Sequence, residues 1–230
     1  GVQVELHPRQ SCCRESLAYY ITQCMTHLQT VVDEQSKKGV MKGLKIDLTG
    51  VVKLSKMDMA RLSPESRQLG CMPSKNAYGH PHVIVDGETV FTRSAAGHIH
   101  VGSEMFNSSN YDNVPDPIMA TRAMDVLVGN TCVLIDRDPL QAKRRKIYGR
   151  AGEFRTPTHG LEYRTLGNFW LQDYRLMSFV FGMTKLTMYV CQSPAYHNQK
   201  ISSGYLAYPN LIKALMKNVD FERFERAINT

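Results

Sequence analysis

The sequence of 230 residues lacks the short motifs that identify several large classes of protein. It contains no Gly-x-x-x-x-Gly-Lys-Ser/Thr, no Gly-x-Gly-x-x-Gly and no Gly-x-Ser-x-Gly. These absences exclude a P-loop, a Rossmann dinucleotide fingerprint and the nucleophile elbow of α/β-hydrolases. Cys-x-x-Cys pairs and zinc-finger spacings of Cys and His are also missing. What remains is a set of polar side chains whose spacing suggests a site.

Long uncharged apolar runs are lacking as well. The longest apolar stretch, 171–190, contains Asp173, Arg175 and Lys185, so we expect a buried amphipathic helix there rather than a membrane span. The first residues have neither the basic nor the apolar region of a secretory signal. The sequence therefore predicts a soluble cytoplasmic protein with no membrane partner.

Cysteines are few and follow no disulfide pattern. The six are Cys12, Cys13, Cys24, Cys71, Cys132 and Cys191. Their even number leaves a disulfide framework open, but a chain of this length can bury a core without such links. We expect free thiols in a reducing compartment. Cys71, beside Gly70 and Pro73, has two interpretations, a structural residue or a nucleophile.

Acidic residues are the scarcer charge. Asp plus Glu number 21 against 28 Lys plus Arg, which gives a net charge of +7 and a pI near 9.1. This surplus favours an anionic partner, whether nucleic acid, phosphate or nucleotide. The chain is 43% apolar and 21% charged, which is typical of globular proteins, and its length suits a single domain over 1–230.

The periodicity of apolar residues predicts an α+β fold, with strands first and a helical C-terminal part. Strands are expected at 2–6, at 44–52 with a break at Gly50, and at 97–102, 153–155 and 161–164, with a hairpin at 83–91 and an irregular excursion at 63–82. Helices are expected at 11–37, at 115–128, from 139, and from about 170 apart from a loop at 193–204. Ser11 is the expected cap of the first helix.

Polar residues that alternate along the expected strands form a candidate metal site, because residues i and i+2 of a strand share a face. The residues concerned are His98 and His100, Glu153 and Arg155, Glu162 and Arg164, and Glu5 on a strand that could join them. Imidazoles with several carboxylates suit a divalent ion, and the carboxylates favour Mg²⁺ or Mn²⁺ over Zn²⁺. The alternative is a set of ordinary polar residues and surface charges.

Basic residues are dense between 137 and 164. The run Lys143–Lys146 fans around a helix and is either a solvated helix end or a patch for nucleic acid, although no aromatic residues interleave with it. Arg150, Arg155 and Arg164 instead lie in turns and strands beside glycines, where bidentate contacts to phosphate are favourable. Such arginines next to metal-binding carboxylates describe a site for a nucleotide polyphosphate.

Five segments of the sequence resemble one protein family when taken in order. They are Gly-Val-Gln-Val-Glu-Leu-His-Pro at 1–8, Leu-Gly-Cys-Met-Pro-Ser at 69–74, Arg-Ser-Ala-Ala-Gly-His-Ile-His-Val-Gly at 93–102, the stretch from Arg-Arg-Lys-Ile-Tyr-Gly to Gly-Glu-Phe-Arg at 144–155, and Gly-Leu-Glu-Tyr-Arg-Thr-Leu-Gly-Asn-Phe-Trp-Leu at 160–171. Over roughly 1–190 the chain resembles the phage-encoded, phiEco32-like carboxylate–amine ligases, which are relatives of glutamine synthetase and glutamate–cysteine ligase.

The resemblance implies an antiparallel, glutamine-synthetase-like sheet that cradles ATP and Mg²⁺ or Mn²⁺. A substrate carboxylate would take the γ-phosphoryl group and an amine would then displace phosphate. Small-molecule or peptide carboxylates and amines are the expected substrates, and nucleic acid is not expected as a partner. By motif, the implied metal ligands are Glu5, His98 and Glu162. The implied phosphate and transition-state contacts are Arg145, Arg150 and Arg164, with His100, Glu153 and Arg155 as further nucleotide-binding residues.

The chain departs from this family at its start. Such ligases begin with a strand that carries acidic ligands in a pattern like Gly-x-Asp-Pro-Glu, and none precedes Gly1 here. A start without Met predicts either trimming or cleavage, so the first strand is expected to be missing. This leaves open an alternative function, a virion or other structural protein that reuses the fold without catalysis, alone or as a homo-oligomer.

Overall fold

The computed structural model describes residues 3–39, 43–67, 74–81, 91–102, 116–158 and 160–192. Helices and short antiparallel strands make up these segments, which confirms the α+β prediction. Nearly all of the hairpin expected at 83–91, the loop expected at 193–204 and Cys71 lie outside the described residues.

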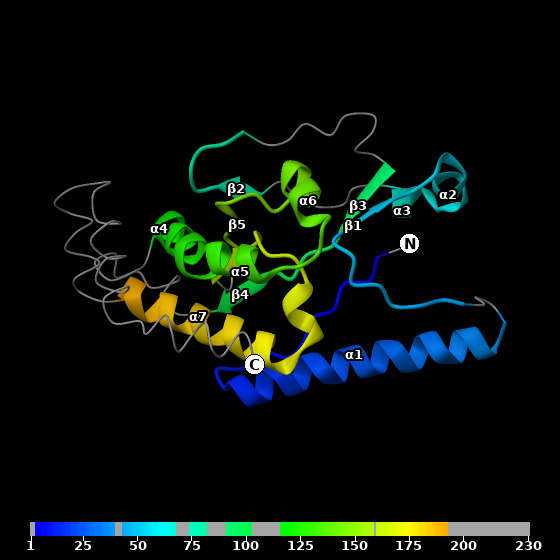
Figure 1. Ribbon diagram of the computed structural model, residues 1–230, viewed down its shortest axis with the longest axis horizontal. Coiled ribbons are helices and arrows are strands. Elements are labelled where there is room, and N and C mark those ends of the chain that lie inside the picture. The colour runs from blue at the N-terminus through cyan, green and yellow to red at the C-terminus, as the bar shows by residue number, and fades with distance from the viewer. Residues whose placement is uncertain are drawn as a thin grey trace.

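The helices differ widely in length. They are α1 (Arg14–Lys37), α2 (Lys56–Arg61), α3 (Pro64–Arg67), α4 (Pro117–Met124), the π-helical segment η4 (Asp125–Gly129), α5 (Asn130–Ile135), α6 (Gln141–Ile147), the 3-10 helix η5 (Phe169–Gln172) and α7 (Tyr174–Gln192). In Figure 1, α1 and α7 lie along one side of the molecule, and α1 extends beyond the other elements.

A four-stranded antiparallel sheet in the order β2–β5–β6–β4 lies at the centre. Its strands are β2 (Lys75–Asn76), β5 (Glu153–Arg155), β6 (Gly160–Tyr163) and β4 (Ile99–Gly102), so strands occur where 97–102, 153–155 and 161–164 were expected. Glu162 is paired with Arg155 on one side and with His100 on the other. Directly opposed residues point to the same face of a sheet, so these side chains share a face.

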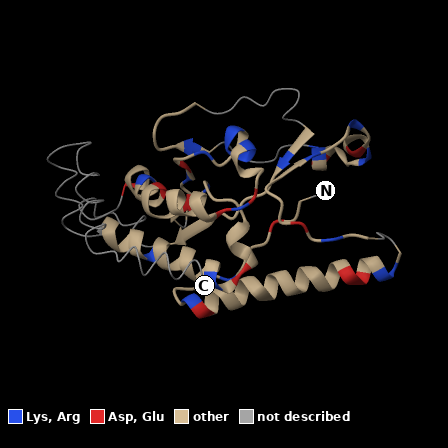
Figure 2. Ribbon diagram, viewed as in Figure 1, with Lys and Arg blue, Asp and Glu red and all other residues tan. Residues whose placement is uncertain are grey.

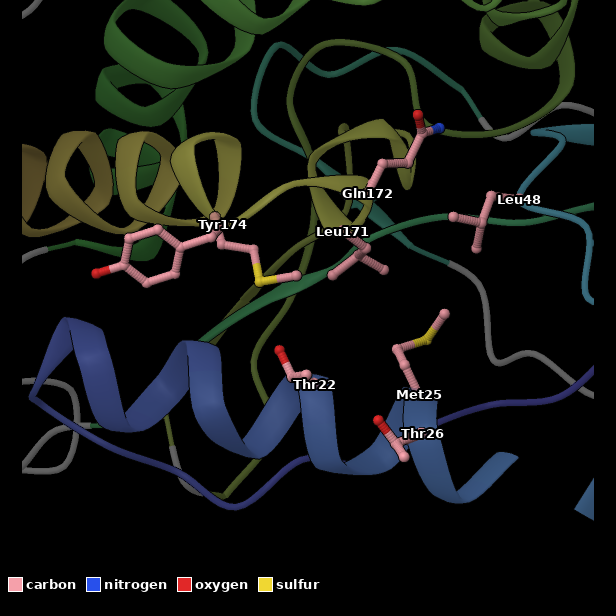
Figure 3. Close-up of a pocket in the computed structure, with 8 residues that line it drawn as sticks. Thr22, Met25, Thr26, Leu48, Leu171, Gln172 and Tyr174 are labelled. Atoms are coloured by element: carbon pink, nitrogen blue, oxygen red, sulfur yellow. The ribbon is translucent and has the colours of Figure 1, made fainter. Parts of the chain in front are cut away.

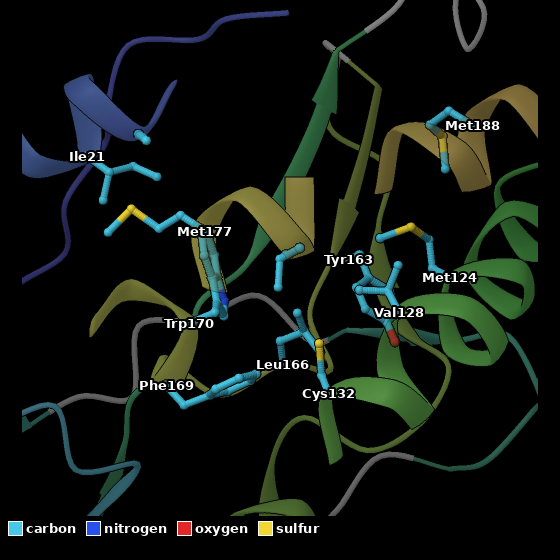
Figure 4. Packing of buried hydrophobic residues seen from close by; sticks show 12 residues of the cluster. Ile21, Met124, Val128, Cys132, Tyr163, Leu166, Phe169, Trp170, Met177 and Met188 are labelled. Carbon is cyan, nitrogen blue, oxygen red and sulfur yellow. The ribbon is translucent and has the colours of Figure 1, made fainter. Parts of the chain in front are cut away.

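The other face of the sheet is apolar and packs against helices. Phe154, Leu161 and Tyr163 are at most 3% exposed. Figure 4 shows Tyr163 of β6 beside Met124 of α4 and Val128 of η4. Burying a large apolar side chain contributes about 1.5–3 kcal/mol, so this layer stabilises the sheet strongly. A functional site on this sheet would therefore lie on the polar face.

α4, η4 and α5 form one continuous helix over 117–135, whereas the sequence predicted an end at 128. It begins where the Asp116 side chain accepts a hydrogen bond from Ile118 N, as expected for an N-cap. By length and composition alone this helix could cross a membrane. In the fold, its Met124 and Val128 are completely buried against the sheet and α7.

The N-terminal predictions need two corrections. Residues 3–10 form no regular secondary structure, so no strand lies over the described part of 2–6; the segment is held instead by Gln3, whose side-chain amide donates to Ser94 O (2.7 Å). The N-cap of α1 is Cys13 rather than Ser11, which lies two residues before this cap and whose hydroxyl accepts from Cys13 N (3.0 Å). Figure 2 shows the charged residues of α1 gathered at its two ends.

The strand expected at 44–52 is much shorter than predicted. Only β1 (Val51–Lys53) pairs, and its partner is β3 (Thr92–Ser94) in a separate two-stranded sheet. The chain bends at Gly50, where the break was expected, and the Gly50 backbone N–H donates to Asp138 Oδ2 (3.0 Å) rather than to a neighbouring strand. The excursion at 63–82 contains α3 and β2, two short elements that the sequence did not predict.

Candidate functional site

Glu162 is the centre of a cluster on the polar face of the sheet. Its side chain is 7% exposed and lies 3.0 Å from His98 Nδ1. His100 Nε2 lies 3.9 Å from Oε1, and Arg155 Nη1 lies 3.8 Å from Oε2. Arg164, itself almost fully buried, donates a hydrogen bond to Oε1. The structure thus brings together five residues that the sequence singled out.

Tyr148 belongs to this cluster and was missed at the level of sequence. Its hydroxyl oxygen accepts a hydrogen bond from Arg164 Nη2 and lies 2.7 Å from His98 Nε2. A carboxylate can only accept, so the His98 proton facing Glu162 is on Nδ1, and the Tyr148 hydroxyl donates to Nε2. This chain of bonds fixes one neutral tautomer of His98. Tyr148 lies within the 144–155 motif, but a tyrosine after a basic helix gives no local signal of such a role.

The ionisation of the cluster follows from its contacts. Burial alone would raise the pKa of Glu162, but the hydrogen bond from His98 and the charge of Arg164 outweigh burial and lower that pKa to about 2. Burial lowers the pKa of His98, against the opposing effect of its bond to the carboxylate. At neutral pH the cluster therefore holds an ionised carboxylate, a neutral imidazole and guanidinium charges.

A second polar group adjoins the first and is centred on Glu153 of β5. This buried carboxylate accepts a hydrogen bond from Gly149 N (3.0 Å) and lies 3.5 Å from Arg150 Nε. Arg150 also donates to Pro81 O (2.5 Å). Gly149 has a φ of +76°, a conformation that favours glycine, and a side chain there would collide with the Arg144 guanidinium. The turn at 149–152 thus holds Arg150 beside the sheet.

The basic run on α6 divides into buried and exposed residues. Arg144 is completely buried and donates hydrogen bonds to Thr165 O and Leu166 O, both at 2.9 Å. Burial lowers the pKa of Arg144 to about 10. Arg145, the expected phosphate contact, is half-buried and interacts with Asp136 and Arg144. Lys143 and Lys146 are exposed, as expected of a helix end.

Glu5 is placed differently from the other expected ligands. It lies in the irregular segment 3–10, its side chain is 80% exposed, and it lies 3.6 Å from His7 Nε2. In the part of the chain that the structure describes, the group whose ligand atoms lie within 4.8 Å of one another consists of His98, His100 and Glu162, without Glu5. The physical reason is that the segment does not pair with the central sheet.

The His98, His100 and Glu162 group could hold a metal ion. Mg²⁺ is typically bound through one or two carboxylates together with phosphate oxygens of a nucleotide. The single buried carboxylate of Glu162 therefore fits a metal ion that is bound as a nucleotide complex. The nearby guanidinium groups of Arg155 and Arg164 fit the phosphate charge itself. The donor set therefore suits a metal–phosphate ligand better than a bare ion.

A separate cleft of about 590 Å³ lies between α1 and the η5–α7 segment (Figure 3). It is lined by uncharged side chains, namely Thr22, Met25, Thr26, Leu48, Leu171, Gln172, Tyr174 and Met177. Without a carboxylate, imidazole or guanidinium in its lining, it offers no group suited to phosphate chemistry. The Glu162 cluster remains the better candidate site.

Comparison with known proteins identifies a family for most of the chain. Residues 83–225 match a family of carboxylate–amine ligases, described as phage phiEco32-like COOH.NH2 ligase-type 2. The match covers more than half of the chain, and the protein belongs to this family. The matched range contains His98, Glu162 and Arg164, while Glu5 and the 69–74 motif lie outside it. No curated protein and no solved structure shows a significant match.

Proposed function

We propose that the protein is an ATP-dependent ligase that joins a carboxylate to an amine through an acyl phosphate. The observation that supports this most is the convergence of His98, Glu162 and Arg164, all within the family match, on one polar sheet face. The family description supplies the bond that is made. The phosphate-binding character of the cluster suggests how that bond is driven.

The proposed reaction has two steps. A substrate carboxylate oxygen attacks the γ-phosphorus of ATP and ADP leaves. The amine nitrogen then attacks the acyl carbon, inorganic phosphate leaves, and the nitrogen loses a proton, giving the amide. Bound Mg²⁺ or Mn²⁺ would neutralise phosphate charge, and Glu162 with the two histidines would hold it.

The residues of the chain have distinct roles in this proposal. Arg155 and Arg164 would hold phosphate oxygens, and Arg150 on its glycine turn would approach from the Glu153 side. Burial keeps His98 neutral and its two hydrogen bonds fix the tautomer with the proton on Nδ1, so Nε2 can offer a lone pair once Tyr148 moves aside. Small-molecule and peptide carboxylates and amines are the substrate classes we expect, in a cytoplasmic setting.

Titration of the full chain with a non-hydrolysable ATP analogue, in the presence and absence of Mg²⁺, tests the proposal first. We expect Mg²⁺-dependent binding that Glu162→Gln and Arg164→Met each weaken by roughly 10- to 100-fold, since both remove a group that binds the metal–phosphate unit directly. Arg175→Ala is the matched control, because Arg175 is an exposed arginine that pairs only locally with Asp173.

A second assay measures ADP release over panels of carboxylates and amines. We expect release that requires both substrates and stops when EDTA removes the divalent ion. If the full chain, with folding confirmed by circular dichroism, binds no nucleotide with either metal, the proposed function is wrong.

A further inference from the structure

Asp125 is a buried carboxyl group that the proposed chemistry does not use. It lies in the π-helical segment η4, on the helix side of the sheet, and is 5% exposed. A π-helical turn inside a longer helix is uncommon and frequently marks a functional position. Burial raises the pKa of Asp125, so a carboxyl group here costs stability that a neutral residue would not.

The hydrogen bonds of Asp125 lead to the strand that carries the candidate site. Tyr163 donates its hydroxyl proton to Asp125 Oδ1 (2.6 Å), and the Thr165 hydroxyl lies 3.4 Å from the same oxygen. The Thr165 hydroxyl also lies 3.1 Å from Arg150 O, to which it donates. The one proton of this hydroxyl serves Arg150 O, so Asp125 bonds Tyr163 directly and lies beside Thr165, which is bonded to the turn that holds Arg150.

Successive side chains from 162 to 165 point to opposite faces of the sheet. Tyr163 and Thr165 point toward the helices, whereas Glu162 and Arg164 point to the polar face. Fixing Tyr163 and Thr165 on the helix side of the strand therefore restricts the positions that Glu162 and Arg164 can take on the polar face. The backbone N–H of Gly152 also interacts with the Asp125 carboxyl group, at the far end of the same turn.

Gly129 provides independent support for this interpretation. It is the last residue of η4, and a Cβ added there would come within 2.4 Å of the Tyr163 hydroxyl oxygen. The helix thus keeps open the space that the tyrosine needs in order to reach Asp125. Gly182 of α7, by contrast, has nothing within 4 Å of its position for a Cβ.

We propose that Asp125 is a positioning residue, which sets the placement of Glu162, Arg164 and the Arg150 turn by accepting hydrogen bonds from Tyr163 and from the Gly152 N–H on the opposite side of the strand, beside Thr165. As a statement about catalysis, this inference rests on the proposed ligase function. As a statement about geometry, it is testable without substrate.

The test uses the imidazole nitrogen resonances of His98 in the full chain, assigned with a His98→Asn variant. The wild-type protein should show a protonated Nδ1 and an unprotonated Nε2. Asp125→Ala should lose the Nδ1–H signal, because Glu162 and Arg164 are no longer held. Asp125→Asn keeps an acceptor for Tyr163 and should retain the signal. Gly129→Ala should lose it and Gly182→Ala should keep it.

Val128→Ala is the control for a general loss of packing around η4. Val128 is also buried in this segment, but its side chain makes no hydrogen bond that the substitution could remove. Its His98 signals should match those of wild type. An unchanged His98 spectrum in a folded Asp125→Ala variant, or the same change in Val128→Ala, overturns the inference. Nucleotide-analogue binding is measured in parallel, with at least a tenfold loss expected for Asp125→Ala. If wild type binds no analogue, the ligase proposal fails while the spectra still decide the positioning role.

Discussion

Neighbouring residues of the same chemical type have different roles in this protein because burial separates them. Arg144 and Arg145 are adjacent on α6, yet the first is completely buried and bonded to backbone carbonyls, while the second is half-buried beside Asp136. A buried guanidinium that satisfies several carbonyl oxygens is structural even in a basic run. Charge density along a sequence therefore does not identify the arginines of a site.

Arg144→Met should destabilise the fold much more than Arg145→Met. Losing the hydrogen bonds to Thr165 O and Leu166 O leaves buried carbonyl groups without a donor, at a cost of about 2–4 kcal/mol, whereas the change at 145 should cost less than about 0.5 kcal/mol. Thermal unfolding of the two variants side by side measures the difference. Equal melting temperatures would contradict the buried role of Arg144.

The pH dependence of stability should reveal Asp125. Its pKa is raised by burial above the unfolded value of 3.8, so its carboxyl group costs no stability well below pH 3.8, and the cost grows as pH rises from 3.8 to the folded-state pKa. Tyr163 and Tyr78 are the titratable groups that contact it, and both stay protonated over this range because their own pKa values are raised.

Asp125→Asn removes this titration and keeps the acceptor for Tyr163. The free energy of unfolding of the wild type, relative to this variant, should therefore fall as pH rises from 3.8 toward the folded-state pKa of Asp125, and then level off. Chemical denaturation at several pH values measures it. If the free energy of unfolding of the wild type relative to Asp125→Asn stays constant or grows with pH, burial does not raise the pKa of Asp125.

The elements owe their boundaries to a few specific contacts. β6 begins at Gly160, whose φ of +142° and close approach to the β4 backbone leave no room for a side chain: a Cβ would come within 2.2 Å of Val101 O. β1 begins directly after the bend at Gly50, and the helix that starts with α4 continues through the π-helical segment η4 to the end of α5 at 135. Gly160 thus allows the β4–β6 pairing that places His100 opposite Glu162.

Gly160→Ala should destabilise the protein by about 2–4 kcal/mol and disturb the candidate site, since either the β4 or the β6 backbone has to shift. Gly182→Ala is its counterpart on α7, where the added methyl meets nothing within 4 Å. There the gain in helix propensity should stabilise the fold by up to about 1 kcal/mol. Opposite signs of the two changes in urea denaturation confirm the argument, and equal signs contradict it.

At the scale of the whole molecule, the sheet separates an apolar layer from a polar one. The helices α4 to α5 and α7 cover the first, and the Glu162 and Glu153 groups occupy the second. The same division separates the thiols in the part of the chain that the structure describes. Cys132 and Cys191 lie inside the helix layer, while Cys12 and Cys13 lie exposed at the start of α1.

Thiol reactivity should follow this division. Burial raises the pKa of Cys132 to about 12, so this thiol is neither ionised nor accessible in the native protein. Iodoacetamide at pH 8 should label Cys12 and Cys13 at least 100-fold faster than Cys132 and Cys191, with peptide mass spectrometry locating each label. In denaturant, the rates should become similar. Fast native labelling of Cys132 would contradict the packing of α5 against the sheet.

The sequence by itself determined the residues that alternate along the strands of the candidate site, although it also included Glu5, which the structure places apart from them. His98, His100, Glu162 and Arg164 were recognisable because strand alternation and family motifs depend only on neighbouring residues. The role of Tyr148, the burial of Arg144 and the place of Asp125 beneath β6 were decided by the tertiary structure. These features arise from the pairing of β4 with β6 and from helix packing, which join residues far apart in the chain, and no local pattern specifies such contacts.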